Sequence, residues 1–259
     1  MTVKNSARER LAAGELAIGV GVRLARTIEI GKLMRGCGYD WLLIDLEHGT
    51  IGLDTASQIS MAALDAGIAP IVRVPQDEYS MAARAIDGGA MGIIMPHVDT
   101  AEQAKATVAN LKYPPLGHLS AGGLMPQNEF KPVRGADAAA SMNQTVLLAV
   151  MLETPTAIAN ADAIAAVPGI DIVMIGTNDL MMEMGIGGNP DHPEIVKAYD
   201  GLIAACKRRG KWAGMGGVHR DEAMARYIRL GAQFILSTSD LALLLVQAAQ
   251  RENLIRGFK

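Results

Sequence analysis

Eight short apolar segments, separated by segments with helical spacing, constrain the fold of this chain more than any other feature. They lie at residues 17–24, 41–46, 69–74, 92–96, 146–155, 170–179, 212–218 and 233–237. Their apolar residues run continuously instead of alternating with polar ones, which is typical of strands buried on both faces of a parallel sheet. Eight such strand–helix units in 259 residues predict an α/β protein, a (β/α)8 or TIM barrel that forms a single domain over residues 1–259.

The helices between these strands show their own signals. They are expected at 26–35, 54–66, 79–87, from 100 onward, and at 136–142, 193–209, 221–230 and 240–254. Asp54 and Thr100 stand at the start of two of them, and both residue types cap helices by accepting a hydrogen bond from a backbone N–H. A Pro- and Gly-rich segment at 113–130 is longer than an ordinary connection, which favours a functional loop or an interface loop.

Composition excludes several classes of function. The net charge is −3, which argues against a nucleic-acid partner because such partners require a basic face. No apolar run is long enough to cross a membrane, and the polar stretch 1–15 lacks the apolar core of a signal peptide. Cys37 and Cys206 lie far apart and are expected to be reduced. We therefore expect a soluble, cytoplasmic protein that acts on a small molecule.

Charged side chains gather at the ends of the predicted strands. Active sites of TIM barrels lie at the carboxyl ends of the strands. A charged group is costly to bury without a partner, so several that converge at one end indicate a polar site. The residues at or just after these ends are Asp45, Glu47, His48, Arg73, His97, Glu153 and Asp179.

Glu153 and Asp179 are the candidate metal ligands. Each follows a buried strand, and the two strands are neighbours in the predicted barrel. Two carboxylates at adjacent strand ends suit a hard divalent cation, which prefers oxygen ligands and keeps sites for water and substrate. The alternative is that each acid caps the helix that follows it.

Three further residues are candidates for acid–base and electrostatic roles. Arg73 ends a buried strand, where a guanidinium can hold a carboxylate or a developing enolate oxygen, or instead form a structural ion pair. His48 follows Asp45 by three residues, and a histidine oriented by a carboxylate is a usual general acid or base. Asp87 precedes two glycines at a helix end, where an acid is disfavoured without a specific partner; that partner could be His48, and the alternative is a solvated acid. His97, just after the strand at 92–96, is a fourth and weaker candidate.

Two other patterns bear on the reaction class. The glycines at 214–217 could cradle a phosphate, as glycines after strands seven and eight do in this fold, or could simply widen the barrel mouth. Lys112 and Lys211 lie outside the predicted mouth, so the sequence offers no lysine at a convincing strand end for a Schiff base.

Taken in order, these motifs resemble those of the HpcH/HpaI aldolase/citrate lyase family of metal-dependent pyruvate aldolases. The resemblance covers about residues 17–245. The matching motifs are WLLIDLEH at 41–48, IVRVP at 71–75, GIIMP at 92–96, YPP at 113–115, LET at 152–154 and IGTNDL at 175–180. Two positions depart from the family pattern: Met151 stands where glutamine is frequent, and Leu119 where arginine is frequent.

The resemblance implies a role for each matching residue. It implies a divalent metal, Mg²⁺, Mn²⁺ or Co²⁺, on Glu153 and Asp179, and Arg73 as the residue that binds the keto oxygen. It implies His48 as the acid–base residue, acting through a water, with Asp45 and Asp87 supporting it; Asp87 does so within the chain or across a subunit boundary. Substrate contacts are expected from Gly176, Thr177, Asn178 and Met151. Family members are commonly hexamers, trimers of dimers that exchange the C-terminal helix.

The expected reaction is reversible aldol cleavage of a 4-hydroxy-2-oxo acid to pyruvate, or a close analogue, and an aldehyde, through a metal-bound enolate. The alternatives within the enzyme class are oxaloacetate decarboxylation and cleavage of a CoA thioester, as in citrate lyase. A phosphate-binding barrel enzyme and a non-catalytic binding protein are two further alternatives.

Overall fold

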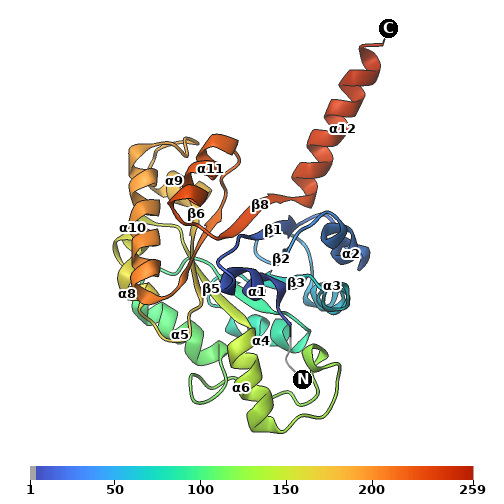
Figure 1. Cartoon of the computed structure of the whole chain (residues 1–259), viewed down its shortest axis with the longest axis vertical. Helices are drawn as coiled ribbons and strands as arrows, with labels where there is room; N and C mark the ends of the chain where they lie inside the picture. The colour runs from blue at the N-terminus through green and yellow to red at the C-terminus, as the bar shows by residue number, and fades with distance from the viewer. Residues whose placement is uncertain (1–3, 259) are drawn as a thin grey trace.

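The computed structural model describes residues 4–258 (Figure 1). The first three residues of the polar N-terminal stretch and the last residue of the predicted domain therefore lie outside the described residues. Within residues 4–258, eight parallel strands close into a barrel in the order β1 to β8, with β8 paired to β1. The strands are β1 (Ala17–Val22), β2 (Trp41–Asp45), β3 (Ala69–Arg73), β4 (Gly92–Met95), β5 (Leu147–Leu152), β6 (Ile172–Gly176), β7 (Trp212–Gly216) and β8 (Phe234–Ser239). The predicted α/β barrel is confirmed.

Helices surround the barrel and connect its strands. They are α1 (Ser6–Ala12), α2 (Glu29–Gly36), α3 (Leu53–Ala66), α4 (Tyr79–Asp87), α5 (Ala101–Leu111), the short 3₁₀ helix η1 (Pro126–Asn128), α6 (Gly135–Thr145), α7 (Pro155–Ala159), α8 (Ala161–Ala165), α9 (Thr177–Glu183), α10 (Pro193–Arg209), α11 (Asp221–Leu230) and α12 (Asp240–Arg256). Thr100 forms the predicted cap, a capping box with Gln103. The cap expected at Asp54 is wrong, because α3 begins at Leu53, so Asp54 lies within its first turn and Gly52 occupies the N-cap position.

The helix α1 was not expected from the sequence, and it closes the N-terminal end of the barrel. Its buried residues are Ala7 and Leu11, which pack with side chains from the barrel interior. The capping residue Asn5 donates hydrogen bonds to the carbonyl oxygens of Met91 and Thr145, just before β4 and β5. This end of the barrel is therefore a packed core.

Aromatic packing fills the barrel interior at the same level. Trp41 and Phe234 stack with ring centroids 4.0 Å apart and an interplanar angle of 10°. A Cβ at Gly19 would lie 2.1 Å from the Trp41 ring, so only glycine admits the indole there. Because the large side chains occupy the N-terminal half, free volume remains at the carboxyl ends of the strands.

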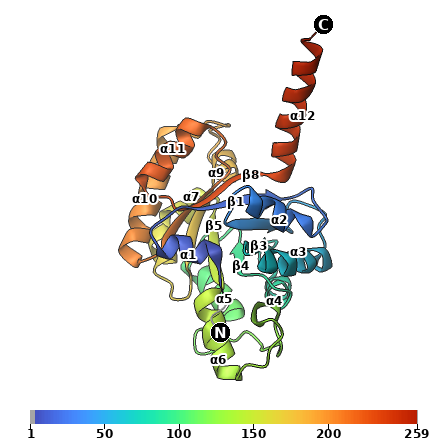
Figure 2. The ribbon, with the colours of Figure 1, turned by 45° about the vertical axis from the view of Figure 1, so that its right-hand side comes forward.

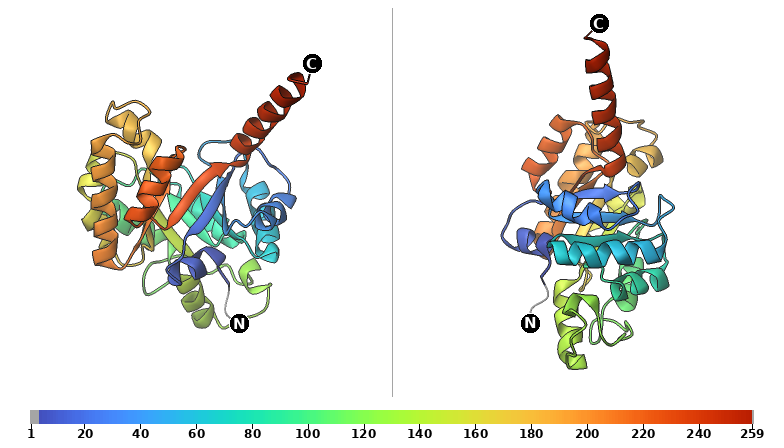
Figure 3. Two further views of the ribbon diagram at one scale, coloured as in Figure 1. Left: turned by 45° about the horizontal axis from the view of Figure 1, so that its top comes forward. Right: turned by 90° about the vertical axis from the view of Figure 1, so that its right-hand side faces the viewer.

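The last helix, α12, leaves the barrel instead of covering it (Figures 1 and 2). Both views in Figure 3 show it projecting away from the other elements, and it has no buried residue. Its exposed side chains include Leu244, Leu245 and Val246. Among the described residues, no helix combines the length and the apolar character that crossing a membrane requires.

Candidate active site

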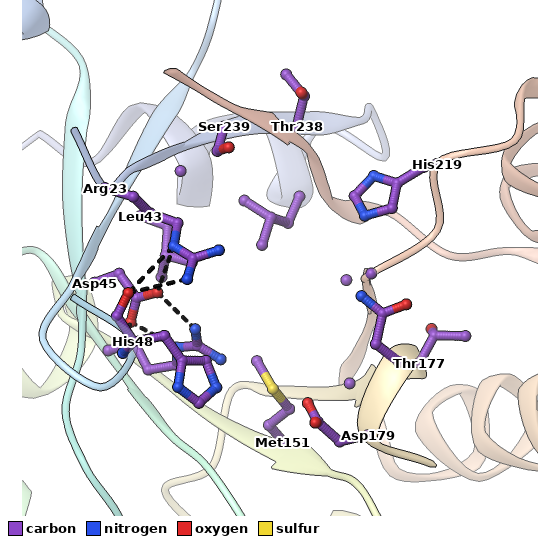
Figure 4. Close-up of a pocket in the computed structure, with 17 residues that line it drawn as sticks. Arg23, Leu43, Asp45, His48, Met151, Thr177, Asp179, His219, Thr238 and Ser239 are labelled. Atoms are coloured by element: carbon purple, nitrogen blue, oxygen red, sulfur yellow. Dashed lines mark hydrogen bonds and ion pairs between the residues drawn. The ribbon is translucent and has the colours of Figure 1, made fainter. Parts of the chain in front are cut away.

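A cavity of about 160 Å³ opens at the carboxyl ends of the barrel strands (Figure 4). Most of the predicted site residues line it: Asp45, His48, Arg73, Met151, Gly176, Thr177, Asn178 and Asp179. In Figure 4, Asp45, His48 and Arg23 lie on one side of the cavity, and Asp179 and His219 lie on the other. The residues predicted from the carboxyl ends of the strands therefore gather around one cavity.

Arg73 is held in the cavity wall by two carboxylates. Its Nε and Nη2 donate to Asp45 Oδ1 and Oδ2 at 3.1 and 2.7 Å, and its Nη1 lies 3.0 Å from Glu47 Oε2. The Asp45 side chain is fully buried. Burial alone would raise the pKa of this carboxyl, but the hydrogen bonds and charge of Arg73 outweigh it and hold the pKa of Asp45 below its ordinary value. Arg73 thus forms an ion pair and faces the cavity at the same time.

His48 is positioned through its backbone, and the structure records no contact between its ring and Asp45. Asp45 Oδ1 accepts hydrogen bonds from the backbone N–H groups of Glu47 and His48 at 3.1 and 3.2 Å. The imidazole Nε2 instead lies 3.8 Å from Glu47 Oε2. The side chain is half exposed, so its ring can reach both the cavity and water.

Glu153 is buried at the end of β5, where His97 binds one of its oxygens. The backbone N–H of His97 donates to Glu153 Oε2 at 2.7 Å, and His97 Nδ1 lies 3.2 Å from the same oxygen. The other oxygen, Oε1, is buried without a hydrogen-bond partner. Burial, together with the negative charges of Asp179 and Glu47, raises the pKa of Glu153 to about 7, although His97 opposes this shift.

His97 links two carboxylates from a strained backbone conformation. Its φ is +52°, in the left-handed region that only a few per cent of residues other than glycine adopt, although histidine does so more often than most. Its Nε2 lies 3.4 Å from Glu47 Oε1, while Nδ1 faces Glu153. Strain of this kind persists where surrounding contacts enforce it, often at functional sites. Sequence reasoning gave His97 only a weak role, and the structure brings it next to the predicted metal ligand.

Glycine at position 176 leaves room for the Glu153 carboxyl. A Cβ there would lie 2.6 Å from Glu153 Cγ and 2.7 Å from Oε1. Because β5 and β6 are paired up to Leu152 and Ile175, Glu153 and Gly176 leave the ladder side by side. Asp179 follows in the first turn of α9 and faces the same cavity.

The alternative that these two acids are helix caps is wrong. The residue that caps α7 is Thr154, whose hydroxyl accepts from the backbone N–H of Ala157, so Glu153 has no capping role. No side-chain hydrogen bond caps α9, so Asp179 does not act as a cap either.

Two carboxylates, one of them with a partnerless buried oxygen, fit a divalent cation. Among residues 4–258, no group of three or more His, Cys, Asp or Glu side chains is arranged to hold a metal ion. Mg²⁺ is commonly bound by one or two carboxylates and keeps several positions for water and substrate, so a two-carboxylate site agrees with its preferences.

Comparison with known proteins assigns the chain to a family. Residues 18–245 match the HpcH/HpaI aldolase/citrate lyase family. The chain belongs to this family. It is 37% identical to a 4-hydroxy-4-methyl-2-oxoglutarate aldolase from Hapsidospora irregularis, over 95% of this chain and 93% of that protein. It is 34% identical to a 4-hydroxy-2-oxo-heptane-1,7-dioate aldolase from Salmonella paratyphi B, over 93% of this chain and 91% of that protein.

Solved structures of the HpcH/HpaI family share the fold. The crystal structure of an HpcH/HpaI aldolase from Desulfitobacterium hafniense superposes with a TM-score of 0.92 at 30% identity, over 98% of this chain and 97% of that one. A family protein from Burkholderia cenocepacia superposes with a TM-score of 0.87 at 27% identity, over 98% of this chain and 100% of that one.

Two predicted site residues of this HpcH/HpaI family member, Asp87 and Glu153, are not among the residues that line the cavity; Glu153 is buried beside Gly176, which does line it. Asp87 ends α4, is exposed, and lies beside Gly122, where an added Cβ would be 3.1 Å from Asp87 Oδ1. Although Asp87 is exposed, the protein atoms around it partly desolvate its carboxyl group and raise its pKa. Its support of His48, within the chain or from a neighbouring subunit, stays a prediction. Leu119, one of the two departures from the family pattern, is buried in the 113–130 segment, whereas Met151, the other, lines the cavity.

The glycines at 214–217, in and just after β7, and the two lysines can also be placed. A Cβ at Gly214 would lie 2.5 Å from Met174 Cβ, and one at Gly217 would lie 3.1 Å from the backbone nitrogen of Asn178. These glycines therefore admit neighbouring protein atoms.

Lys112 is buried, donates hydrogen bonds to the carbonyl oxygens of Asn143 and Val146, and does not line the cavity. Lys211 does not line it either.

Sequence reasoning missed several residues of the cavity wall. Arg23 directly follows β1, and Thr238 and Ser239 end β8. His219, which the sequence did not mark as a candidate because it lies in a loop, also lines the cavity, two residues after Gly217. Arg23 stands at the carboxyl end of β1, where site residues were sought, but the predicted strand 17–24 extended past it.

Proposed function

We propose that this protein is a divalent-metal-dependent aldolase that reversibly cleaves a 4-hydroxy-2-oxo acid to pyruvate, or a close analogue, and an aldehyde. The chain is a carbon–carbon lyase of the pyruvate-aldolase class, in line with aldolases that are 34–37% identical to it. One observation carries the proposal: Asp179 and Arg73 line one cavity, and Glu153, buried beside the lining residue Gly176, has an Oε1 without a hydrogen-bond partner.

Glu153 and Asp179 would hold the cation. When bound, it supplies a Lewis acid for the carboxylate and keto oxygens of the substrate. His97 holds Glu153 Oε2, which leaves Oε1 directed away from that contact. Gly176 keeps the space beside Oε1 free of a side chain. The chain thus fixes one ligand oxygen before any metal binds.

Arg73 stabilises the negative charge that develops as the C3–C4 bond breaks. The electron pair of that bond stays on C3 and is delocalised onto the keto oxygen as an enolate. A guanidinium fixed in place needs no reorganisation to accept this charge, which is how positioned donors lower such barriers. Asp45 and Glu47 fix Arg73 from two sides, so its position is set by the fold.

His48 handles the proton. In the cleavage direction its imidazole, through a water, takes the proton of the 4-hydroxyl group, and C4 becomes the aldehyde carbon. The protonated His48 then returns a proton through the water to C3 of the enolate, which becomes pyruvate. The half-exposed ring can exchange its proton with solvent, which the reverse reaction also requires.

Exchange of the methyl protons of pyruvate tests the enolate directly. We expect the wild type to incorporate deuterium at C3 of pyruvate in the presence of Mg²⁺ or Mn²⁺, to lose this activity in EDTA, and to recover it when metal is restored. Arg73→Ala should be silent. Full exchange in EDTA, or a covalent adduct trapped by borohydride, contradicts the mechanism. Product analysis separates aldol cleavage from oxaloacetate decarboxylation and from cleavage of a CoA thioester.

The oligomer and the location of the protein stay predictions. Family resemblance supports a hexamer, a trimer of dimers with an exchanged C-terminal helix. The apolar side chains of α12, among them Leu244 and Leu245, are exposed on a helix that does not pack on its own barrel. Light scattering on the full chain and on a chain ending before Asp240 tests this arrangement, since the shortened chain should form smaller assemblies. The cytoplasmic location rests on composition alone.

A further inference from the structure

Arg23 places a cationic side chain on the wall of the cavity opposite the predicted metal ligands. It directly follows β1, and in a closed ring of eight strands β1 lies across from β5, which carries Glu153. Its Nε and Nη2 donate to the carbonyl oxygen of His48 at 3.2 and 3.0 Å. Figure 4 shows the guanidinium extending into the cavity beside Asp45.

The charge of Arg23 is less well compensated than that of Arg73. Arg73 makes a bidentate pair with Asp45 and a second pair with Glu47. Arg23 has only a 3.7 Å contact between its Nε and Asp45 Oδ2, an oxygen that already accepts a hydrogen bond from Arg73. Among residues 4–258, the structure records no hydrogen bond from Arg23 Nη1. The Arg23 guanidinium therefore faces the cavity with its positive charge only partly compensated and with 44% of its side chain exposed.

The expected orientation of the substrate brings its far end to Arg23. The 2-oxo acid end belongs between Arg73, which pairs with Asp45, and the predicted metal ligands Glu153 and Asp179. His48 would handle the 4-hydroxyl proton, so C4 lies near His48. Because the Arg23 guanidinium contacts the His48 backbone, the group attached to C4 extends toward Arg23.

We propose that Arg23 is a specificity-determining residue that binds a carboxylate on the aldehyde or ketone acceptor, so that the substrates are 4-hydroxy-2-oxo acids with a second carboxylate. A guanidinium recognises a carboxylate by charge and by parallel N–H donors, which a neutral acceptor cannot match. This inference rests on the proposed aldolase function and adds the chemical class of the acceptor.

A purely structural role for Arg23 makes a different prediction. If Arg23 only fixed the His48 loop through the His48 carbonyl oxygen, its loss would slow reactions of every acceptor by a similar factor. If it binds the acceptor carboxylate, its loss falls selectively on acidic acceptors. The ratio of rates for an acid and its neutral amide therefore separates the two roles.

The test compares the addition of pyruvate to succinic semialdehyde and glyoxylate with its addition to the corresponding neutral amides. In the wild type with Mg²⁺, we expect kcat/KM to favour the acids by about tenfold or more, as for other hydrogen bonds to charged groups. Arg23→Ala should bring the ratio close to one, and high salt should reduce it in the wild type. Arg208→Ala, which removes an equally charged side chain that pairs with Asp162 outside the cavity, should keep the wild-type ratio.

Three results overturn the inference. Equal losses for acids and amides in Arg23→Ala would show that the side chain only fixes the loop. A wild type that treats acids and amides alike overturns it without any variant, so a poorly folding Arg23→Ala does not block the test. A wild type that fails to exchange the C3 protons of pyruvate overturns the proposed function and this inference with it, whereas exchange without acid preference overturns the inference alone.

Discussion

Replacing Gly176 by alanine should displace Glu153 and weaken metal binding. The added Cβ would lie 2.6 Å from Glu153 Cγ and 2.7 Å from Oε1, both closer than side chains tolerate. Glu153 cannot move freely, because it is buried and His97 binds its Oε2. Overpacking of this kind costs about 1–3 kcal/mol, or roughly 2–12 °C in Tm for a chain of this length. Mn²⁺ affinity should fall by about 10- to 100-fold, as when a supporting residue of a metal site is lost.

Gly216 provides a matched control. Gly216, on β7, pairs with Gly176, on the neighbouring strand β6, so the two positions occupy the same level of the barrel. A Cβ at Gly216 would lie 3.4 Å from Met174 Cε, an ordinary contact. Thermal unfolding and calorimetric titration with Mn²⁺ should therefore show a large change for Gly176→Ala and a small one for Gly216→Ala. If Gly176→Ala binds Mn²⁺ as tightly as the wild type, Glu153 is not a ligand.

Three further predictions concern the residues around Arg73 and His97. Arg73→Met should lower the free energy of unfolding by about 3–5 kcal/mol, because it leaves the Asp45 charge buried without its partner. Urea unfolding measures this loss of stability, and adding Asp45→Asn to the Arg73→Met chain should recover part of the loss. The depressed pKa of Asp45 means that its stabilisation is complete above about pH 4 and is lost as the pH falls through its folded-state value, so urea midpoints should drop in acid more steeply for the wild type than for Asp45→Asn. His97→Gly should be more stable than His97→Ala, since only glycine adopts a φ of +52° without strain; equal stability would argue against strain at this position.

The barrel could be predicted because its signal is local and repeated. Each strand is a continuous apolar run, so eight separate segments gave the same answer. The helix α1 escaped because only Ala7 and Leu11 of its seven residues are buried. What holds it is the contact of Asn5 with carbonyl groups 86 and 140 residues away, which no local pattern reveals.

The site could be predicted as far as strand ends determine it. Asp45 and Arg73 end neighbouring strands in register, so the barrel alone brings them together. The contact of His97 with Glu153 depends on a left-handed residue just after β4, and apolar periodicity carries no information about such a turn. The pairing of Asp45 with the His48 imidazole was expected from spacing alone. The Asp45 carboxylate instead accepts hydrogen bonds from the backbone N–H groups of Glu47 and His48, because the chain turns directly after β2 and directs these N–H groups toward the carboxylate.

The distribution of charge explains why this cavity suits a cation on one side and an anion on the other. On the β5–β6 side, Glu153 lies near Asp179 and Glu47, and these charges, added to burial, raise the pKa of Glu153 to about 7. A divalent cation there removes that repulsion, so its binding and the ionisation of Glu153 favour each other. On the β1 side, the guanidinium groups of Arg73 and Arg23 share Asp45, and that of Arg23 faces the cavity with its positive charge only partly compensated. A substrate with negative groups at both ends matches both sides, one end through the cation and Arg73, the other through Arg23.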